Sequence, residues 1–284
     1  MNSSRSFNAR ALRRRFDDAA ETFDGADFVH AATRDGLLER LAPMVIDAAI
    51  VVDLGAATGA ALKPLGKRFR KATVIAVDIS RQMTRKCRAR RRWPRPLPAV
   101  QADARALPFA DASVDVVFSN LLLPWIDDPA TLAAEVARVL RKDGLFVFST
   151  LGPDSFSALR EAWAAIDDGA HVLDFPDMHD VGDALVRAGL SDPVLDVDRL
   201  DVSYGSPDRL FDDLTAVGAR NSLADRPGGL TPPRTIDRLV QALSQDPPVR
   251  IEFELVYGHC WGSGQARNPG AIRIDPGNIP LRQK

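Results

Sequence analysis

The segment IVVDLGAATG at residues 50–59 determines the expected fold. A short β-branched run, typical of a buried strand, is followed by a turn bracketed by Gly55 and Gly59 and then by a stretch of helical length. Glycine lets the backbone turn sharply and approach a ligand, and the N-terminus of the following helix favours anionic groups. The next run, TVIAVD at residues 73–78, ends in Asp78, whose carboxylate can accept hydrogen bonds from both hydroxyls of a ribose. This order of elements predicts a nucleoside-ligand site.

Further apolar runs extend the same pattern along the chain. PAVQAD (98–103), VDVVFSN (114–120) and GLFVFST (144–150) follow the first two runs, with helix-like stretches between them. Two more strands are expected near residues 193–203 and 249–259. Runs that are hydrophobic on both faces and separated by helices are typical of parallel strands covered on both sides. The fold class is therefore α/β, with a doubly wound sheet.

The segments outside the strands suggest how the chain is organised. Residues 9–42 have helical spacing, so residues 1–42 are expected to form an N-terminal helical cap and residues 43–264 the main domain. Within that domain, residues 152–192 and 205–245 are expected to form a helical lid. Residues 265–284, rich in Gly and Pro, are expected to be a flexible tail.

Four segments in order resemble the motifs of class I S-adenosylmethionine-dependent methyltransferases: DLGAATG, Asp78, QADARALPF and VFSNLLLPW. In that family the glycine turn holds the methionine moiety, the acid after the second strand holds the ribose, and the third motif binds adenine. The resemblance implies that residues 43–264 are a methyltransferase domain built on a mostly parallel, seven-stranded Rossmann-like sheet, with S-adenosylmethionine as cofactor and S-adenosylhomocysteine as product. A dinucleotide-binding enzyme is the alternative for the glycine turn alone, but the last two segments favour the methyltransferase. The implied binding positions are Asp53, Gly55, Ala57, Gly59, Asp78, Ile79, Asp103, Ala104 and Asn120.

A longer pattern, over about residues 9–261, is similar to the malonyl-acyl-carrier-protein O-methyltransferases of biotin synthesis and to related complex I assembly factors. It includes RRRFDDAAETFD, SNLLLPWIDDP, HVLDFPDMHD and VYGHCW. The chain departs from that pattern at Ala57, usually glycine, at Pro124, commonly Gln or His, and at Phe23, commonly Tyr. Three functions stay open: a carboxyl O-methyltransferase, a protein-modifying or respiratory-complex assembly factor, and a non-catalytic binding protein of the same fold.

Carboxylate methylation needs few catalytic groups. A malonyl carboxylate with a pKa of about 4 is ionised at pH 7, so no general base is required. Catalysis can rest on holding the carboxylate about 3 Å from the methyl group in a dry pocket. For the aromatic candidates, ordinary packing in the core or lid is the alternative role. The pocket candidates are Phe23, Asn120, Trp125, His171 and Tyr204.

The formal net charge of -1 conceals two oppositely charged segments. Residues 63–95 hold thirteen Lys or Arg and one acid, whereas residues 167–213 hold thirteen Asp and three Arg. Arg81, Arg85, Arg88 and Arg92 recur at the spacing of one helix face. The face is either a solvated surface or a docking site for an acidic acyl-carrier protein. Few aromatics are interleaved with it, which argues against a nucleic-acid partner.

Cysteine spacing and apolar run lengths argue against disulfides, a metal site and a membrane span. Cys87 and Cys260 are far apart and form no CxxC array, so neither a disulfide framework nor a zinc site is expected, and a cytoplasmic location fits. The segment HVLDFPDMHD contains two His and three Asp, but we expect no metal there and interpret Asp177 as a helix cap. No run reaches the roughly 18 apolar residues of a membrane span.

Overall fold

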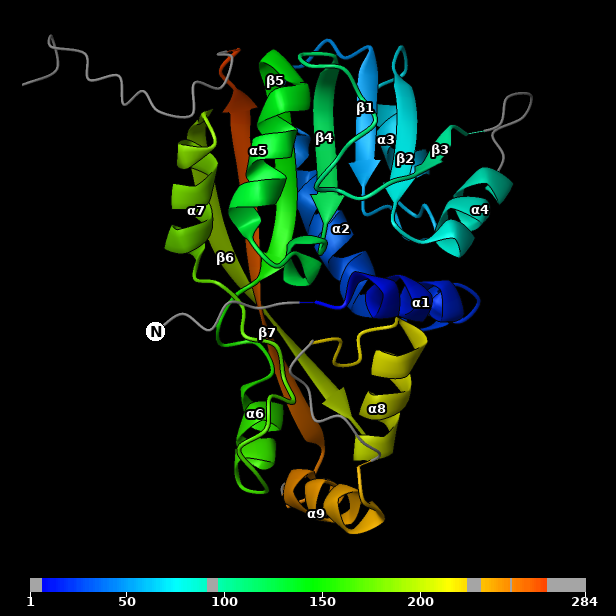
Figure 1. Cartoon of the computed structure of the whole chain (residues 1–284), viewed down its shortest axis with the longest axis vertical. Helices are drawn as coiled ribbons and strands as arrows, with labels where there is room; N and C mark the ends of the chain where they lie inside the picture. The colour runs from blue at the N-terminus through cyan, green and yellow to red at the C-terminus, as the bar shows by residue number, and fades with distance from the viewer. Residues whose placement is uncertain (1–6, 91–96, 224–230, 246, 265–284) are drawn as a thin grey trace, which may run out of the picture.

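Seven strands form one sheet in the order β3-β2-β1-β4-β5-β7-β6 (Figure 1). The computed structural model describes residues 7–90, 97–223, 231–245 and 247–264. Strands β1 to β5 are parallel, and β7 is antiparallel to both of its neighbours, β5 and β6. The doubly wound, mostly parallel sheet expected from the apolar runs is confirmed. The bounds are β1 Ile50–Leu54, β2 Thr73–Asp78, β3 Ala99–Gln101, β4 Val114–Asn120, β5 Leu140–Leu151, β6 Leu190–Tyr204 and β7 Val249–Gly262.

Several helices begin at a side chain that satisfies a free backbone amide. Ser80 Oγ accepts a hydrogen bond from Met83 N at the start of α4, and Asp177 Oδ1 accepts one from His179 N at the start of α7. The cap expected at Asp177 is confirmed. The helices are α1 Ala9–Ala19, α2 Phe28–Leu41, α3 Leu62–Arg68, α4 Arg81–Ala89, α5 Pro129–Val139, α6 Ser157–Ala164, α7 Met178–Arg187, α8 Pro207–Ala216 and α9 Pro233–Leu243, with 3-10 turns η1 Phe23–Gly25 and η2 Leu123–Trp125.

Helices cover both faces of the sheet (Figure 1). Buried residues of α5 and α7 form one apolar cluster with Val52 and Val117, and buried residues of α2 and α3 form another with Val51 and Val116. Successive residues of β1 and β4 thus point to opposite faces, and both faces are buried. This burial explains why the strands appear as continuous apolar runs in the sequence rather than as alternating ones.

Strands β6 and β7 continue past the parallel strands into a lower lobe that also contains α6, α8 and α9 (Figure 1). Leu159 of α6, Leu210 of α8 and Leu239 of α9 belong to the same buried cluster as Val51, so the core is continuous between lobe and sheet. Helix α7, which lies in the range expected for the lid, instead packs on α5 and β6. Its buried face, including Val181 and Leu185, meets the sheet cluster. Residues 178–187 therefore belong to the sheet layer and not to the lid.

The N-terminal segment forms a cap at the carboxyl edge of the parallel strands. Helix α1 crosses between the sheet and the lower lobe (Figure 1), and α2 packs against β4 and β5. Phe23 of η1 is buried in a small apolar cluster with Ala19, Ala20, Met83 and Val217. The cap thereby touches both α4, through Met83, and the lower lobe, through Val217. The expected tail, residues 265–284, lies outside the described residues.

Candidate functional site

A cavity lies at the carboxyl ends of β1, β2 and β4, where neighbouring strands lead to opposite sides of the sheet. Ligands of doubly wound sheets bind at this switch point. The cap supplies one wall through Phe7, Leu12, Phe16 and Phe23. Of the nine expected cofactor-binding positions, Asp53 and Gly59 do not line the cavity. The expected residues that do line it are Phe23, Gly55, Ala57, Asp78, Ile79, Asp103, Ala104, Asn120 and Trp125.

The glycine turn has left-handed backbone conformations at three positions. Gly55, with φ 74°, donates its amide to Val77 O at 2.8 Å, and a Cβ there would lie 3.1 Å from the Cβ of Leu122. Gly59, with φ 85°, leaves no room for a side chain because a Cβ would lie 2.7 Å from Leu62 Cδ1. Ala57 has φ 46° although it carries a Cβ. The role of Gly59 visible here is to shape the turn, whereas Gly55 and Ala57 face the cavity.

Asp78 is the carboxylate that connects the turn to the second strand. Its Oδ2 accepts from Ala57 N at 2.9 Å and its Oδ1 accepts from Ser80 N at 2.8 Å. Burial raises the pKa of Asp78 to about 6, although these two amide bonds act in the opposite direction. Each carboxylate oxygen keeps further acceptor capacity, so the side chain can still bind two hydroxyl groups.

Asp53 lies deeper than the cavity wall. The residue is 2% exposed, and Oδ2 has no hydrogen-bond partner among the described residues. Burial, and next the negative charge of Asp78, raise the pKa of Asp53 to about 7, while the positive charge of Arg34 opposes the shift. Asp53 therefore lies behind the cavity wall, where its charge interacts with those of Asp78 and Arg34.

Asp103 is held by a partner that sequence reasoning missed. Arg105 donates from Nε to Oδ1 at 3.0 Å and from Nη2 to Oδ2 at 2.8 Å, and this pairing holds the pKa of Asp103 below its usual range. Arg105 Nη1 also lies 3.5 Å from Asp127 Oδ2. The pair fixes the orientation of the carboxylate, which keeps lone pairs for a further donor such as an amino group.

Asn120 is also engaged by the protein. Its Nδ2 donates to His30 O at 3.0 Å, and its Oδ1 accepts from Ser149 Oγ at 2.8 Å. These bonds connect the end of β4 to the first turn of α2 and to β5. The amide keeps one N–H for a ligand, while its main visible effect is to fix the position of α2.

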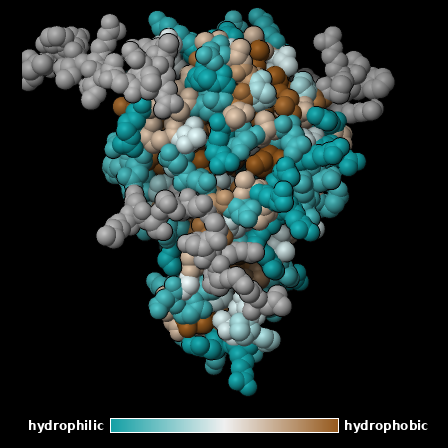
Figure 2. Space-filling model, viewed as in Figure 1, coloured by the Kyte–Doolittle hydropathy of each residue, from teal (hydrophilic) through white to brown (hydrophobic). Residues whose placement is uncertain are grey.

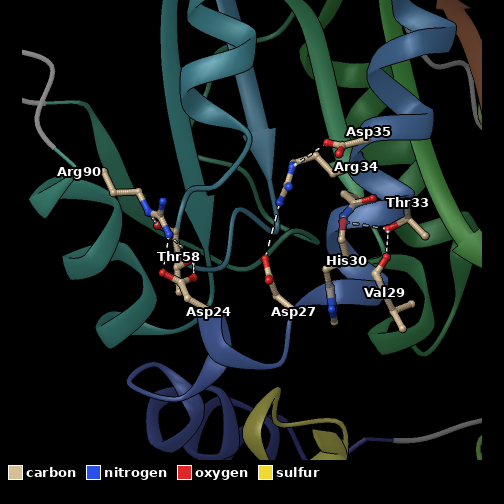
Figure 3. Close-up of polar contacts among 10 residues, drawn as sticks. Asp24, Asp27, Val29, His30, Thr33, Arg34, Asp35, Thr58 and Arg90 are labelled. Carbon is tan, nitrogen blue, oxygen red and sulfur yellow. Dashed lines mark hydrogen bonds and ion pairs between the residues drawn. The ribbon is translucent and has the colours of Figure 1, made fainter. Parts of the chain in front are cut away.

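A network of polar contacts ties the cap to the glycine turn (Figure 3). Thr58 Oγ1 donates to Asp24 Oδ1 at 2.5 Å. Arg90 donates to Asp24 Oδ2 at 2.5 Å and to Thr58 O at 2.7 Å. Since Asp24 belongs to η1 and Arg90 follows α4, this network holds the cap closed over the first cavity. We refer to Asp24, Thr58 and Arg90 as the cap clip.

A second cavity of about 570 Å³ lies between the cap and the lower lobe. Its walls are mainly apolar and aromatic, with contributions from Phe28, Phe156, Trp163, Phe211 and Phe253. Four residues line both cavities and mark the place where they adjoin: Phe16, His30, Leu121 and Trp125.

The remaining pocket candidates line the second cavity. Tyr204 is 8% exposed, and burial raises the pKa of its hydroxyl to about 12. His171 stacks on Trp163 with ring centroids 3.6 Å apart, and its Nε2 lies 2.6 Å from Asp167 Oδ1. Both side chains line the second cavity and belong to the lower lobe.

Sequence reasoning did not single out His30. A lone histidine at the start of a helical stretch carries no local signal, because its place beside Phe23 and Asn120 depends on contacts distant in sequence. The described residues contain no group of three or more His, Cys, Asp or Glu arranged to hold a metal ion. None of the described helices combines the length and apolar character that crossing a membrane requires.

Comparison with known proteins identifies the family. A family model described as a methyltransferase domain matches residues 52–148. A malonyl-[acyl-carrier protein] O-methyltransferase of Halorhodospira halophila is 40% identical over 290 residues, which cover 99% of this chain and 98% of that protein. This chain belongs to the malonyl-[acyl-carrier protein] O-methyltransferase family. Another member of the family, from Laribacter hongkongensis, is also 40% identical, and the match covers 88% of each chain.

Solved structures agree on the fold. The YcgJ protein of Bacillus subtilis superposes with a TM-score of 0.58 at 17% identity, covering 80% of this chain and 98% of that one. A putative methyltransferase of Haloferax volcanii, in complex with the Trm112 activator, has a TM-score of 0.56 at 20% identity, covering 90% and 99%. The Rossmann-like methyltransferase architecture expected from the sequence is confirmed.

As a member of this family the protein is an S-adenosylmethionine-dependent methyltransferase. The first cavity fits that cofactor in its chemistry. Gly55 has no side chain, so its backbone stays accessible to a ligand at a position where a Cβ would contact Leu122. Asp78 offers acceptor positions for ribose hydroxyls, and Asp103 offers acceptors for an amino group.

Proposed function

We propose that this enzyme methylates the free carboxylate of a malonyl group carried as a thioester on acyl-carrier protein, a step of biotin synthesis. The observation that carries the proposal is the pair of adjoining cavities. One has the acceptors suited to a nucleoside, and the other is a mainly apolar space that reaches the first at Phe16, His30, Leu121 and Trp125. The relatives' name supports the choice of acceptor.

The reaction requires the protein mainly to orient the acceptor carboxylate and to exclude water from it. S-adenosylmethionine supplies an electrophilic methyl group on a positively charged sulfur. The new O–C bond forms as the C–S bond breaks, the electron pair stays on sulfur, and no proton is transferred. The protein holds the carboxylate in line, and Phe16, Leu121 and Trp125 exclude water where the cavities adjoin. Opposite charges disappear in this step, so a poorly solvating pocket favours it.

The proposal is tested by incubating the full chain with S-adenosylmethionine and malonyl-acyl-carrier protein and detecting the methyl ester by mass spectrometry. We expect a single methyl group on the malonyl carboxylate. Acetyl-acyl-carrier protein, which lacks that carboxylate, is the matched negative control. An enzyme that binds S-adenosylhomocysteine but never methylates the malonyl thioester would contradict the choice of substrate.

We further propose that exposed arginines of α4 contribute to docking of the acidic carrier protein. Arg81 and Arg85 are exposed, and the region of α1 and α4 is mostly hydrophilic (Figure 2). Arg88 has a structural role, because its Nη2 donates to Ala99 O of β3 at 2.6 Å. Arg92, the fourth residue of the expected stripe, lies outside the described residues. The docking proposal therefore rests on Arg81 and Arg85.

The cytoplasm is our proposed location for this reaction. Cys87 and Cys260 are both buried free thiols, a state compatible with a reducing compartment.

A further inference from the structure

His30 lies where the first and second cavities adjoin. Its ring lines both cavities and is stacked obliquely beside Phe23, with ring centroids 4.9 Å apart. The side chain extends from the first turn of α2 away from the Asp27–Arg34 ion pair (Figure 3). Among the described residues, nothing forms a hydrogen bond with the buried Nδ1 atom. A buried polar atom without a partner is costly unless a ligand or water satisfies it.

The backbone that carries His30 is fixed from two sides. Asn120 Nδ2 donates to His30 O at 3.0 Å, and Thr33 Oγ1 donates to the same oxygen at 3.1 Å. Asn120 is itself held by Ser149. These bonds fix the backbone of His30 beside the ends of β4 and β5 and use neither ring nitrogen, so both nitrogens stay available to a ligand.

The imidazole is neutral at physiological pH. Burial, with a further contribution from the positive charge of Arg34, lowers the pKa of His30 to about 4. A neutral imidazole carries one N–H donor and one acceptor nitrogen. The ring can therefore donate a hydrogen bond without adding positive charge to the place where the cavities adjoin.

Only two of the four residues shared by both cavities carry an N–H donor in the side chain, His30 and Trp125. The ring of Trp125 is packed edge-on against Phe16 with centroids 5.3 Å apart. A methyl acceptor has to lie within about 3 Å of the methyl group, so its carboxylate must be at this place. His30 is the shared residue that combines a buried nitrogen without a partner with a fixed backbone.

We propose that His30 donates its ring N–H to the carboxylate oxygen of the acceptor that does not attack, and thereby selects a carboxylate-bearing acyl group. This inference rests on the proposed function. A neutral donor suits the reaction, because both reacting charges disappear in the transition state. A cation on the carboxylate would stabilise the ground state more than the transition state and would slow the step.

The test compares His30→Leu, which removes both ring nitrogens, with His30→Gln, which keeps a neutral N–H donor. We expect His30→Leu to lower kcat/KM for malonyl-acyl-carrier protein by about 10- to 100-fold, the range for loss of a hydrogen bond to a charged group. His30→Gln should recover a large part of that loss. The affinity for S-adenosylhomocysteine, measured by calorimetry, should stay within about threefold in both variants.

A binding readout separates selection from structural damage. With S-adenosylhomocysteine bound, the wild-type enzyme should bind malonyl- more tightly than acetyl-acyl-carrier protein, and His30→Leu should lose that difference. His259→Leu is the matched control, since His259 lies in β7 and lines neither cavity. An unchanged preference in His30→Leu, or equal losses in both His30 variants, would overturn the proposal. Failure of the wild-type enzyme to methylate malonyl-acyl-carrier protein would instead reject the proposed function.

Discussion

Ala57 holds a left-handed backbone conformation, φ 46°, at the point where the glycine turn faces the first cavity. For a residue with a Cβ this conformation costs roughly 1–2 kcal/mol, and glycine avoids the cost. Asp78 and Cys87 contribute to holding the conformation, because Ala57 N donates to the carboxylate and the thiol donates to Ala57 O at 3.1 Å. The position thus tolerates alanine because its neighbours fix the backbone.

Because Ala57 lines the first cavity, Ala57→Gly removes a methyl group from the cavity wall and should tighten S-adenosylhomocysteine binding by up to about fivefold. The free energy of unfolding should change little, because relief of strain is offset by the roughly 0.4–1 kcal/mol that glycine loses through greater freedom in the unfolded chain. Calorimetry and urea denaturation measure the two effects. Ala112→Gly is the control, since Ala112 has φ 49° and lies exposed outside both cavities. Weaker binding by Ala57→Gly would show that the methyl group contributes a useful contact.

Asp53 makes the stability of the ligand-free enzyme depend on pH. Its pKa is about 7 in the folded protein and about 4 in an unfolded chain, so the folded state binds more protons between these values. The contribution of Asp53 to stability is then complete below pH 4 and is lost as the pH rises through about 7. Asp78, whose pKa is raised to about 6, acts in the same direction.

Asp53→Asn should remove much of this pH dependence. As the pH rises from 5 to 8, the free energy of unfolding of the variant should increase relative to that of wild type. The pKa of Asp53 is raised from about 4 to about 7, and at about 1.4 kcal/mol for each pKa unit this limits the increase to about 4 kcal/mol. Comparing two pH values in urea denaturation separates the charge from any packing effect. Asp18→Asn, at an exposed position of α1, should show the wild-type dependence. Parallel pH profiles for Asp53→Asn and wild type would refute the assignment.

Residues of the site differ in how well the sequence predicts them. Gly55 and Asp78 follow directly from the order of strand, turn and strand, because local geometry places them at the sheet edge. Arg105 could have been suspected from its position two residues after Asp103. His30 could not, because its environment is formed by Phe23, Asn120 and the two cavities, which meet only in the folded chain.

Among the elements, the cap clip joins the N-terminal segment to the glycine turn at the first cavity. Arg90 contacts both Asp24 of η1 and the carbonyl of Thr58 in the glycine turn (Figure 3). On its other side, the cap is joined to α8 through Thr22 Oγ1, which donates to Ala216 O at 2.8 Å. The cap therefore contacts both the wall of the first cavity and the lower lobe.

Arg90→Gln should weaken the cap without unfolding the enzyme. The Asp24 and Arg90 side chains are 54% and 41% exposed, so the loss in stability should stay below about 1 kcal/mol. S-adenosylhomocysteine should dissociate about 3- to 10-fold faster, as measured by stopped-flow fluorescence. Arg187→Gln is the control, because Arg187 pairs with Asp183 on the exposed surface of α7. A dissociation rate unchanged by Arg90→Gln would mean that cap opening does not limit release.

At the level of elements, the strands were more predictable than the lid. The parallel strands are short apolar runs whose pattern is local, and all seven strands were expected from the sequence, including the more polar β6. The packing of α7 on α5 and the extension of β6 and β7 into the lower lobe depend on contacts distant in sequence. The spacing of apolar residues along one helix, such as Val181 and Leu185 in α7, shows which face of the helix is buried. It does not show against which layer of the fold that face packs.

Over the whole molecule, the two oppositely charged segments lie on different parts of the fold. The basic residues 63–90 include α3 and α4, beside β2 and β3, whereas the acidic residues 167–213 include α7, β6 and α8 at the other edge and in the lower lobe (Figure 1). Helix α4 packs on α1, which supplies Arg15 and Phe16 to the wall of the second cavity. An acidic partner docked on α4 would therefore sit next to that wall.

Charge reversal at Arg81 and Arg85 should therefore raise KM for malonyl-acyl-carrier protein by about 10-fold at low salt and by less at 0.5 M salt, because surface attraction is screened over about a Debye length. KM for a small malonyl thioester and kcat should stay unchanged, as both residues lie outside the two cavities. Arg187→Glu, on the exposed surface of α7 within the acidic segment, is the matched control. Steady-state kinetics with both acceptors decides the question: if the Arg81→Glu, Arg85→Glu variant keeps the wild-type KM for the carrier protein, the carrier docks on another surface.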